Sequence, residues 1–386
     1  MVVATAAPTP AAAQLTLRLT AVPPTTPPGA TIHVAGTFNG WDPGGVGWTL
    51  APHPEGGYAI TLPAAVRGPV TFKFTLGTWI RVETAADGRD VPNRTAEAPA
   101  SGTATYTGTV ARWRDSLPSP VRSTVSPSVR VLADSFAMPQ LGRQRRVWVY
   151  LPPGYATSTR RYPVLYVHDG QNVFDAATSF AGEWGVDETL DSLAARGDRG
   201  VIVVAVDNGG PRRLDEYSPW RHPDPRYGGG EGAAYVDFLV RTLKPHVDRR
   251  YRTLPDRRHT GVLGSSMGGL ISLYAGLRHP EVFGQVGVFS CACWFARPQI
   301  YDLARRTRPG REPTRFYFVA GAVETPDGGP ARDQAEMVRT LAAAGFPTGR
   351  AVASRVAADG THAEWFWRRE FPAAYRWLFG PAAGTR

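Results

Sequence analysis

The stretch GVLGSSMGGLISLYAG, residues 261–276, joins a short apolar run to an apolar helical run through a turn of serine and glycine. Within it, GSSMG fits the pattern G-x-S-x-G, in which a strand passes into a helix through a turn with no room for bulky neighbours. Gly264, Gly268 and Gly269 meet that requirement. The pattern predicts that Ser266 projects above the carboxyl edge of a sheet, over the N-terminus of the following helix, as a nucleophile would.

The segments around this turn predict the rest of the domain. After about residue 128, apolar strand candidates alternate with amphipathic helical segments. The strand candidates are RRVWVYLP, YPVLYVHDG, GVIVVAVDNG, HTGVLGSS, QVGVFSCA and FYFVAGAV. Near-continuous apolar strands between such helices are typical of a mostly parallel sheet that is covered by helices on both faces. Together with the serine turn, they predict an α/β-hydrolase domain over residues 128–382.

The first part of the chain has a different pattern. Between residues 15 and 110, short alternating runs are separated by Pro, Gly and Asp turns, as in TLRLTAV, TIHVAGTF, VTFKFTL and TATYTGTV. This spacing predicts a small antiparallel β-sandwich over 15–110. Residues 111–127, rich in Ser, Pro and Arg, are predicted to be a linker. Residues 1–14, rich in Ala and Pro, are interpreted as a flexible leader or a signal remnant, which slightly favours a secreted or periplasmic location over the cytoplasm.

Composition excludes several classes of protein. With 386 residues, 42% of them apolar, the chain is long enough for two domains with proper cores. Its net charge of +10 comes almost wholly from arginine, because only Lys73 and Lys244 among the 43 basic residues are lysines. The arginines are scattered among acids without a nucleic-acid motif, so nucleic acid is not an expected partner. No run approaches 18 apolar residues, and we therefore expect no membrane insertion.

The chain has two cysteines, Cys291 and Cys293, in FSCACWF. If this segment is a strand, both side chains share one face, and such close pairs rarely form good disulfides. Two cysteines alone do not make a zinc site either. We expect both to be small buried apolar residues, and we expect neither a metal nor an organic cofactor.

A serine nucleophile needs a histidine base and an acid that orients the base. In α/β-hydrolases the order along the chain is serine, acid, histidine. His362, in AADGTHAEWFW, follows the serine after another predicted strand and is the predicted base. Glu324 directly follows the strand FYFVAGAV and is the predicted acid, with Asp327, three residues later, as the alternative.

Acyl transfer also requires hydrogen-bond donors for the oxyanion. The backbone N–H of Met267, next after the nucleophile, is one candidate. The second is the backbone N–H of Gln171, in the loop that follows the strand in LYVHDGQNVF, where Gly170 permits a sharp bend. His168 and Asp169 in the same segment are expected to stabilise this loop.

With these residues in place, positions 130–380 resemble the Putative esterase family that includes esterase D, feruloyl esterases and enterochelin esterase relatives. The resemblance rests on VWVYLPPGY, YVHDGQNVFD, GEWGVDETLD, RLDEYSPW, HTGVLGSSMGGLISLYAGLRHPEVFG and DGTHAEWFW. It implies ester hydrolysis without a metal, with Ser266, an acid and His362 as the triad. The chain has FSCACW where the family pattern would give FSPAFW, so the cysteines are expected to alter the pocket wall near Trp294.

Residues 15–110 are similar to starch- and glycogen-binding modules of the immunoglobulin-like sandwich type. The stretches that carry the similarity are VAGTFNGWDP, TFKFTLGTW and VPNRT. The resemblance implies that Trp41, Trp79 and Lys73 contact a sugar, with Asn93 as a weaker candidate. A polysaccharide is therefore a candidate partner. Alternatively, Trp41 belongs to the core and the sandwich only packs on the catalytic domain.

The substrate is expected to be a small-molecule or glycan-linked ester. Candidate contacts are four residues in loops expected to face the serine, namely Trp184, Arg213, Tyr217 and Trp294. Acylated carbohydrates or aromatic acyl esters fit the N-terminal module, whereas catecholate siderophore esters fit the arginine bias. Acyl transfer to an alcohol would use the same triad. The alternative to an enzyme is a non-catalytic glycan-binding protein on a hydrolase scaffold.

Overall fold

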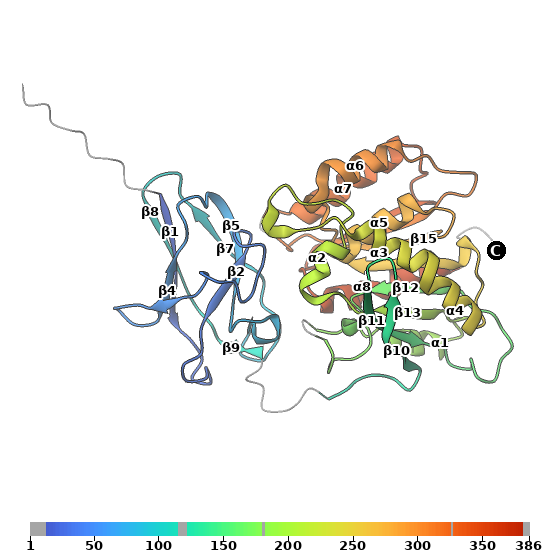
Figure 1. The fold of residues 1–386 in the computed structure, drawn as a ribbon, viewed down its shortest axis with the longest axis horizontal. Coiled ribbons are helices and arrows are strands. Elements are labelled where there is room, and N and C mark those ends of the chain that lie inside the picture. The colour runs from blue at the N-terminus through green and yellow to red at the C-terminus, as the bar shows by residue number, and fades with distance from the viewer. Residues whose placement is uncertain (1–12, 115–121, 180–181, 326, 381–386) are drawn as a thin grey trace, which may run out of the picture. The chain divides into compact units, whose positions relative to one another are not determined.

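The computed structural model describes residues 13–114, 122–179, 182–325 and 327–380. The chain divides into two compact units (Figure 1), residues 1–120 and 121–386. The described residues of the first unit share one hydrophobic core, and those of the second form two. Residues 1–12 of the expected leader lie outside the described residues. Its last residue, Gln14, is the first residue of the first strand. Among the described residues, no helix combines the length and the apolar character that crossing a membrane requires.

The first unit is built of β-strands. Its sheets have the orders β3-β4-β1-β8 and β2-β5-β7, with a short β6-β9 pair beside them. Apolar side chains at alternate positions of β1 and β5, such as Leu17 and Phe72, share one core. The strands are β1 (Gln14–Ala21), β2 (His33–Gly36), β3 (Ala51–Pro52), β4 (Tyr58–Thr61), β5 (Gly68–Thr75), β6 (Glu83–Thr84), β7 (Arg94–Ala98), β8 (Thr103–Thr109) and β9 (Arg112–Trp113).

One strand pair corrects the expectation of a purely antiparallel sandwich. Strands β1 and β8 run parallel, whereas the other paired strands of this unit run antiparallel. The chain enters the other sheet as β7 before it returns as β8, and such a crossover connection is what parallel pairing needs.

The linker is also shorter than residues 111–127. Strand β9 pairs with β6, and Trp113 is fully buried in the core of the first unit, where its indole N–H donates to Thr26 Oγ1 at 2.9 Å. On the other side, the backbone N–H of Ser126 donates to Asp187 Oδ2 at 2.8 Å in the second unit. Residues 115–121 of the expected linker lie outside the described residues. Hydrogen bonds therefore hold both ends of the segment that composition alone predicts to be a linker.

The second unit has the predicted α/β architecture. Strands β10 and β11 pair antiparallel at one edge, β11 runs antiparallel to β13, and the remaining neighbours run parallel. Its eight strands, in order across the sheet, are β10 (Val129–Met138), β11 (Arg143–Tyr150), β13 (Ile202–Val206), β12 (Val164–His168), β14 (Thr260–Ser265), β15 (Gln285–Phe289), β16 (Arg315–Gly321) and β17 (Val352–Ala357).

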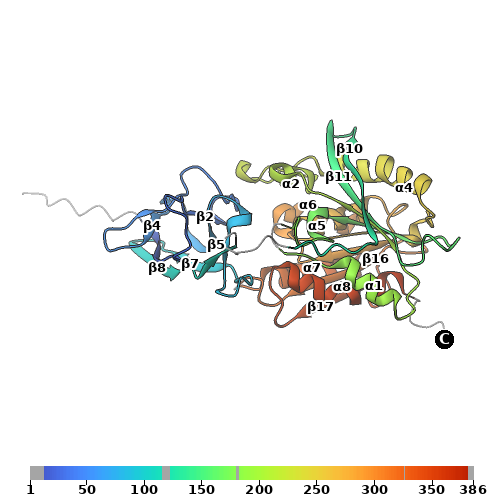
Figure 2. The same cartoon turned by 90° about the horizontal axis from the view of Figure 1, so that it is seen from below.

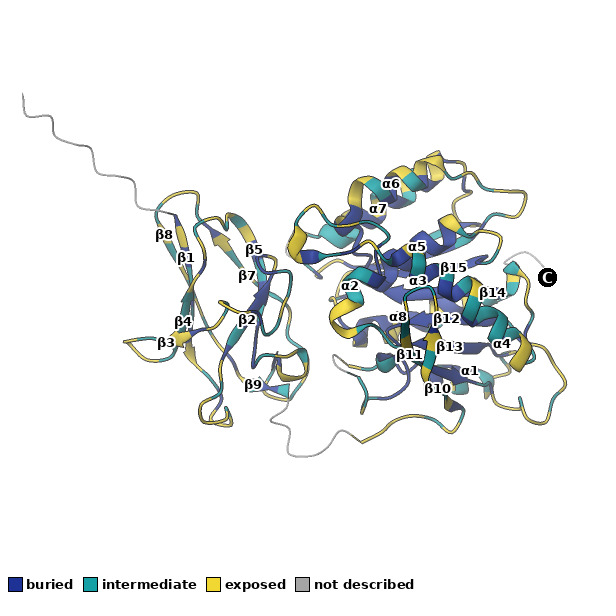
Figure 3. Cartoon of the chain, in the orientation of Figure 1, coloured by how far each residue is buried: buried dark blue, intermediate teal, exposed yellow. Residues whose placement is uncertain are grey.

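Helices cover both faces of this sheet. Successive residues of β11 point to opposite sides, with Val147 in the core beneath α3, α5, α6 and α7, and Trp148 in the core beneath α1 and α8. Figure 2 shows α1 and α8 on one side and α4 on the other, and Figure 3 shows the strands between them as buried. The helices are α1 (Val186–Ala194), α2 (Arg213–Glu216), α3 (Gly232–Phe238), α4 (Lys244–Arg250), α5 (Met267–Arg278), α6 (Arg297–Arg306), α7 (Gly329–Ala343) and α8 (Glu364–Phe379).

The parallel strands place the candidate site residues at one edge. Strands β12, β14, β15, β16 and β17 run in the same direction, so their carboxyl ends meet at the same edge of the sheet. The segments that follow these ends carry, in that order, Gln171, Ser266, Trp294, Glu324 and His362. Side chains that are up to 191 residues apart in the sequence therefore come to one side of the domain.

Candidate functional site

Ser266 occupies a strained turn between β14 and α5. Its φ of 57° and ψ of −120° lie in a region that residues with side chains rarely adopt. Three backbone hydrogen bonds hold it: its N–H donates to the Phe289 carbonyl oxygen at 2.9 Å, and its carbonyl oxygen accepts from the N–H groups of Leu270 at 3.1 Å and Ala292 at 3.0 Å. The side chain is partly exposed, whereas Ser265 is buried. The turn thus presents the second serine of the pair.

The glycines beside Ser266 are sterically required. A Cβ atom on Gly264 would lie 2.8 Å from the backbone of Gly268, and one on Gly269 would lie 2.8 Å from the carbonyl oxygen of Phe289. Either contact is closer than carbon atoms approach without displacement of the backbone. The strand and the helix can therefore meet at this angle only if both positions lack a side chain.

His362 is paired with Glu324. The ring Nδ1 lies 2.7 Å from Glu324 Oε2, and the Glu324 side chain is buried at the end of β16. Because a carboxylate only accepts, Nδ1 carries the proton, and Nε2 is left with a free lone pair. Asp327 instead pairs with Arg332 and Thr325 in an exposed position. The structure therefore brings Glu324, not Asp327, to the histidine.

Two residues that the sequence did not single out support this carboxylate. Ser290 Oγ donates to Glu324 Oε1 at 2.7 Å, and the Trp367 indole N–H donates to Ser290 Oγ at 2.8 Å. The backbone N–H of Gly321 also donates to Glu324 Oε1, at 2.5 Å. Ser290 lies directly after β15 with φ 44°. Its position at a strand's carboxyl end was the signal that could have identified it.

The loop after β12 is held by a buried ion pair. Arg213 donates from Nε to Asp169 Oδ1 at 2.7 Å and from Nη2 to Asp169 Oδ2 at 2.9 Å. The Asp169 N–H donates to Tyr217 Oη at 3.0 Å, and the Asn208 N–H donates to the side-chain oxygen of Gln171 at 3.1 Å. Asp169 itself has φ 57°. These bonds fix the backbone of the helical turn η3 (Gly170–Asn172), which carries the expected second oxyanion donor.

Met267, the other expected donor, is the first residue of α5. The first N–H groups of a helix have no carbonyl partner within the helix, and they lie at its positive end. The position next to Ser266 therefore offers an unused donor from the helix itself.

Three of the four expected substrate contacts are structural residues. Trp184 is 4% exposed and packs on Trp367, with ring centroids 5.6 Å apart. Tyr217 is fully buried, and Arg213 is bound to Asp169. This corrects the expectation that these three side chains face the substrate, because they pack or form ion pairs within the loops. Only Trp294 is exposed, at 46%.

Trp294 belongs to a cluster of aromatic rings. Its ring centroid lies 5.6 Å from that of Tyr227 and 5.9 Å from that of His222, and Phe295 is 5.7 Å away. It lies in the turn η8 (Cys293–Ala296), which begins one residue after Ala292, whose N–H is bonded to Ser266. An exposed indole is therefore tied by the backbone to the serine turn.

The two cysteines form a disulfide, contrary to our expectation. Cys291 and Cys293 are joined, with Cα atoms 5.2 Å apart. The expectation assumed a strand, but β15 ends at Phe289, and the chain turns at Ala292 with φ −75° and ψ 48°. The turn brings the two sulfur atoms together. The disulfide thus closes the segment between the Ser290 support and Trp294.

In the first unit, the expected sugar contacts are only partly assembled. Trp41 and Trp79 lie side by side, with ring centroids 6.2 Å apart, and both are half-buried. Lys73 donates to the Val91 carbonyl oxygen, and burial lowers the pKa of its ammonium. Asn93 is half-buried in the same part of the chain.

His168 is a buried neutral histidine beneath the site. Its Nδ1 lies 2.9 Å from Tyr235 Oη, and its Nε2 is buried with no hydrogen-bond partner among the described residues. The pKa of His168 is lowered to about 4, above all by burial; Asp169 opposes this shift and Arg213 adds to it. Together with the ion pair of Asp169, this agrees with a role in holding the loop.

Comparisons with known proteins place these residues in context. Residues 138–378 match the family model described as Putative esterase. The uncharacterized protein YbbA of Bacillus subtilis is 26% identical over 253 residues, which is 62% of this chain and 95% of YbbA. An endo-1,4-beta-xylanase/feruloyl esterase of Xylanibacter ruminicola is 27% identical over 59% of this chain and 28% of its own length.

Two further similarities extend the comparison. An alpha-amylase of Niallia circulans is 42% identical over 106 residues, which is 28% of this chain and 8% of the amylase. The structure of the enterobactin esterase FES from Shigella flexneri in the presence of enterobactin aligns with a TM-score of 0.54 at 19% identity, over 91% of this chain and 88% of the esterase. At that identity, the likeness shows the fold.

We predict that the second unit loses stability in acid through His168. The unfolded histidine has a pKa near 6.5, whereas the folded one has a pKa of about 4, so only the unfolded state binds a proton between these values. The free energy of unfolding should therefore fall by up to about 1.4 kcal/mol per pH unit from this group as pH drops through that range. Urea unfolding from pH 7 to pH 4 measures it. His168→Gln should flatten that limb, and an equally steep limb in this variant would contradict the prediction.

Proposed function

The chain belongs to the Putative esterase family and is a carboxylic ester hydrolase, and on that premise we propose that it works through a triad of Ser266, His362 and Glu324. The observation that carries the proposal is the 2.7 Å contact between His362 Nδ1 and buried Glu324, at the sheet edge where the strained turn presents Ser266. A histidine held in this way has Nε2 available as a base. A buried carboxylate favours the imidazolium that forms when the base takes a proton.

In the proposed reaction, His362 Nε2 takes the proton of Ser266 Oγ while that oxygen attacks the ester carbonyl carbon. The C–O bond to the alcohol then breaks, and the alcohol leaves with the proton from His362. Water attacks the acyl-serine ester with the same histidine as base, which releases the acid and restores Ser266. An alcohol in place of water would give acyl transfer with the same residues.

The backbone N–H groups of Met267 and Gln171 are the proposed oxyanion donors. Met267 supplies the first N–H of α5, and Gln171 lies in η3, whose backbone is held by Asp169 and Asn208. Donors that are already fixed before the reaction stabilise the developing charge without a cost of reorganisation. The ion pair of Asp169 with Arg213 thus acts as a support for catalysis.

An apolar rim favours an aromatic acyl group. Three exposed large apolar side chains, Trp294, Val323 and Trp365, follow the carboxyl ends of β15, β16 and β17. An aromatic ring would find apolar partners there. The name of the Xylanibacter ruminicola relative includes feruloyl esterase activity, which agrees with this substrate class.

A catecholate siderophore ester is the rival substrate, and it would need free positive charge. Three arginines at this edge are already paired, Arg213 with Asp169, and Arg143 and Arg145 with Glu216. Paired arginines attract an anionic ligand weakly. The charge pattern therefore favours a neutral aromatic ester.

Fluorophosphonate labelling with peptide mapping tests the triad. Label should appear on Ser266, disappear in Ser266→Ala and His362→Gln, and persist in the matched control Ser265→Ala. Turnover of a simple ester should fall by about 10⁴-fold or more in Ser266→Ala. Glu324→Gln should lose about 10³-fold or more, since the amide cannot stabilise the imidazolium, while Asp327→Asn should stay near wild type. Label on another residue, or full turnover in Ser266→Ala, would refute the triad, and strong polysaccharide retention without turnover would favour the non-catalytic alternative.

Substrate comparison tests the aromatic preference. We expect kcat/KM for methyl ferulate to exceed that for acetylated sugars and for a catecholate trilactone. Trp294→Ala should lower it for methyl ferulate by about 2- to 12-fold, the value of one lost aromatic contact, and change the acetyl ester little. Val131→Ala, which truncates an exposed residue on edge strand β10, is the control. Equal losses on aromatic and acetyl esters would speak against a ring-binding role.

We further propose that the first unit binds a polysaccharide through Trp41 and Trp79. The support is the pair of half-buried indoles 6.2 Å apart, whose flat faces suit pyranose CH groups, and the amylase similarity is consistent with it. The affinity of the full chain for insoluble starch and arabinoxylan should fall about 5- to 150-fold in Trp41→Ala, since the stacking of a flat ring on an aromatic side chain is worth about 1–3 kcal/mol. Ile80→Ala, next to Trp79 and exposed, should bind like wild type. Absence of retention in the wild-type protein would sink the idea.

A further inference from the structure

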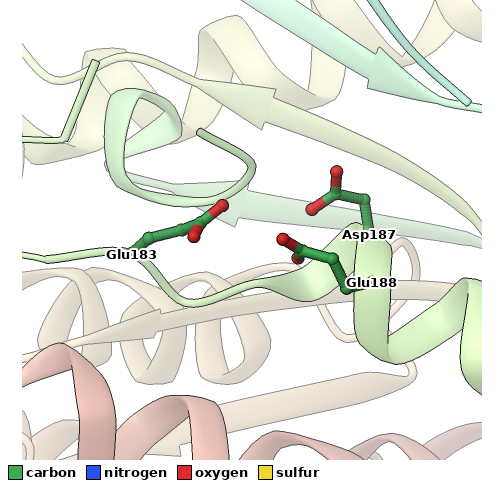
Figure 4. Close-up of side chains that lie close together, drawn as sticks. All are labelled: Glu183, Asp187 and Glu188. Atoms are coloured by element: carbon green, nitrogen blue, oxygen red, sulfur yellow. The ribbon is translucent and has the colours of Figure 1, made fainter. Parts of the chain in front are cut away.

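Three carboxylates gather beside the first turn of α1. Glu183 precedes the helix, and Asp187 and Glu188 lie in its first turn. One oxygen from each lies within 4.8 Å of the others, and Figure 4 shows the carboxylates turned toward one another. None of the three belongs to the proposed triad.

The cluster contains buried oxygens that have no hydrogen-bond partner. Asp187 is fully buried, and its Oδ2 accepts from the Ser126 N–H at 2.8 Å. Its Oδ1, and Oε2 of Glu188, are buried without a hydrogen-bond partner among the described residues. A buried carboxylate oxygen without a partner is costly, so such atoms mark a place where a ligand is missing.

The surrounding charges do not balance the cluster. Among the described residues, the cation within ion-pairing distance is Arg368, whose Nη1 lies 3.5 Å from Glu183 Oε2. Thr124 Oγ1 donates to Glu183 Oε1 at 2.8 Å but brings no charge. Three carboxylates and one guanidinium leave a formal charge of −2. One divalent cation would neutralise it.

We propose that Glu183, Asp187 and Glu188 bind a divalent cation, for which Ca²⁺ is the best match. The donors are all oxygens, which excludes the nitrogen and sulfur ligands that zinc prefers. Ca²⁺ accepts six to eight oxygens in flexible geometry, so water and backbone carbonyl groups can complete three carboxylates from one loop and one helix turn. Mg²⁺ requires near-ideal octahedral geometry and is rarely bound by protein groups alone. The site is structural and takes no part in bond breaking.

The cation would tie α1 to the loop that carries Gln171. The Trp184 N–H donates to the Asn172 carbonyl oxygen at 2.9 Å, and the Val186 N–H donates to the Val173 carbonyl oxygen at 3.2 Å. Trp184 and Val186, which lie between the proposed ligands Glu183 and Asp187, thus form hydrogen bonds with the backbone that follows Gln171. Trp184 also packs on Trp367, which supports Glu324 through Ser290. Binding therefore stabilises the base of the catalytic edge, and its effect on turnover, though not the binding, rests on the proposed function.

Calorimetry and thermal unfolding of the full chain, freed of metal with EDTA, test the site with CaCl₂. We expect one Ca²⁺ per chain with a Kd of about 10⁻⁶ to 10⁻³ M, the weaker half of the range of protein calcium sites. At a hundredfold excess over Kd, the melting temperature of the second unit should rise by about 5 to 10 °C. MgCl₂ should give a smaller rise. Tb³⁺ bound in place of Ca²⁺ should emit when tryptophan is excited, because Trp184 adjoins Glu183.

Three variants separate this site from general salt effects. Glu188→Gln and Asp187→Asn keep the shape of the side chains, and both should abolish the Ca²⁺-induced rise and the Tb³⁺ emission. Glu336→Gln, an acid on α7 that pairs with Arg297, is the matched control and should respond like wild type. No Ca²⁺ response in the wild type, or a response that survives in both variants, overturns the proposal.

These measurements are independent of turnover, so failure of the triad proposal would leave them interpretable. Where turnover is present, saturating Ca²⁺ should raise kcat more than it changes KM, because it fixes an oxyanion donor and not a substrate contact. That gain should vanish in Glu188→Gln. A gain of equal size in Glu188→Gln would contradict the coupling to the loop.

Discussion

The structure of the second unit depends on how closely a strand and a helix can approach at one serine. Gly264 and Gly269 lie so near the backbone of neighbouring segments that neither has room for a Cβ atom. This contact sets the angle at which α5 leaves β14, holds Ser266 at positive φ, and directs the free N–H groups of the helix toward the same point. The position of the proposed nucleophile and that of its proposed oxyanion donor are thus consequences of one steric constraint at the centre of the sheet.

Buried polar groups hold the other parts of the edge in place. Glu324 accepts hydrogen bonds from Ser290 and Gly321 as well as contacting His362, and Asp169 is bound by Arg213 and Asn208. A loop fixed by buried, satisfied charges has few alternative conformations, because each alternative would leave a charge without a partner. The same rule makes the acidic cluster at α1 conspicuous, since two of its buried oxygens have no such partner.

Exposure separates the residues near the site into buried ones that support the loops and exposed ones that are candidates for substrate contact. Trp184 and Tyr217 have the chemistry of substrate-binding residues but lie in the interior, where they pack beneath the loops. Trp294 has the same chemistry and is exposed, because the segment after β15 turns at Ala292 and the disulfide closes that turn. Aromatic side chains in loops therefore do not identify a substrate pocket until their burial is known.

The sequence by itself determined the order and type of most elements and the serine turn, identified His362 as the candidate base, and narrowed the acid to Glu324 or Asp327. These depend on local rules: periodicity, the need for glycine in a tight turn, and the position of a residue just after a strand. Only the tertiary structure decided that Glu324 and not Asp327 contacts His362. It also showed that Ser290 donates to that carboxylate and Trp367 to Ser290. The disulfide between Cys291 and Cys293 is likewise a result of the tertiary structure. The tertiary structure also placed Trp113 in the core of the first unit and gathered Glu183 with Asp187 and Glu188. Each of these facts depends on the distance and direction between side chains from separate segments, and periodicity along a single chain carries no information about either.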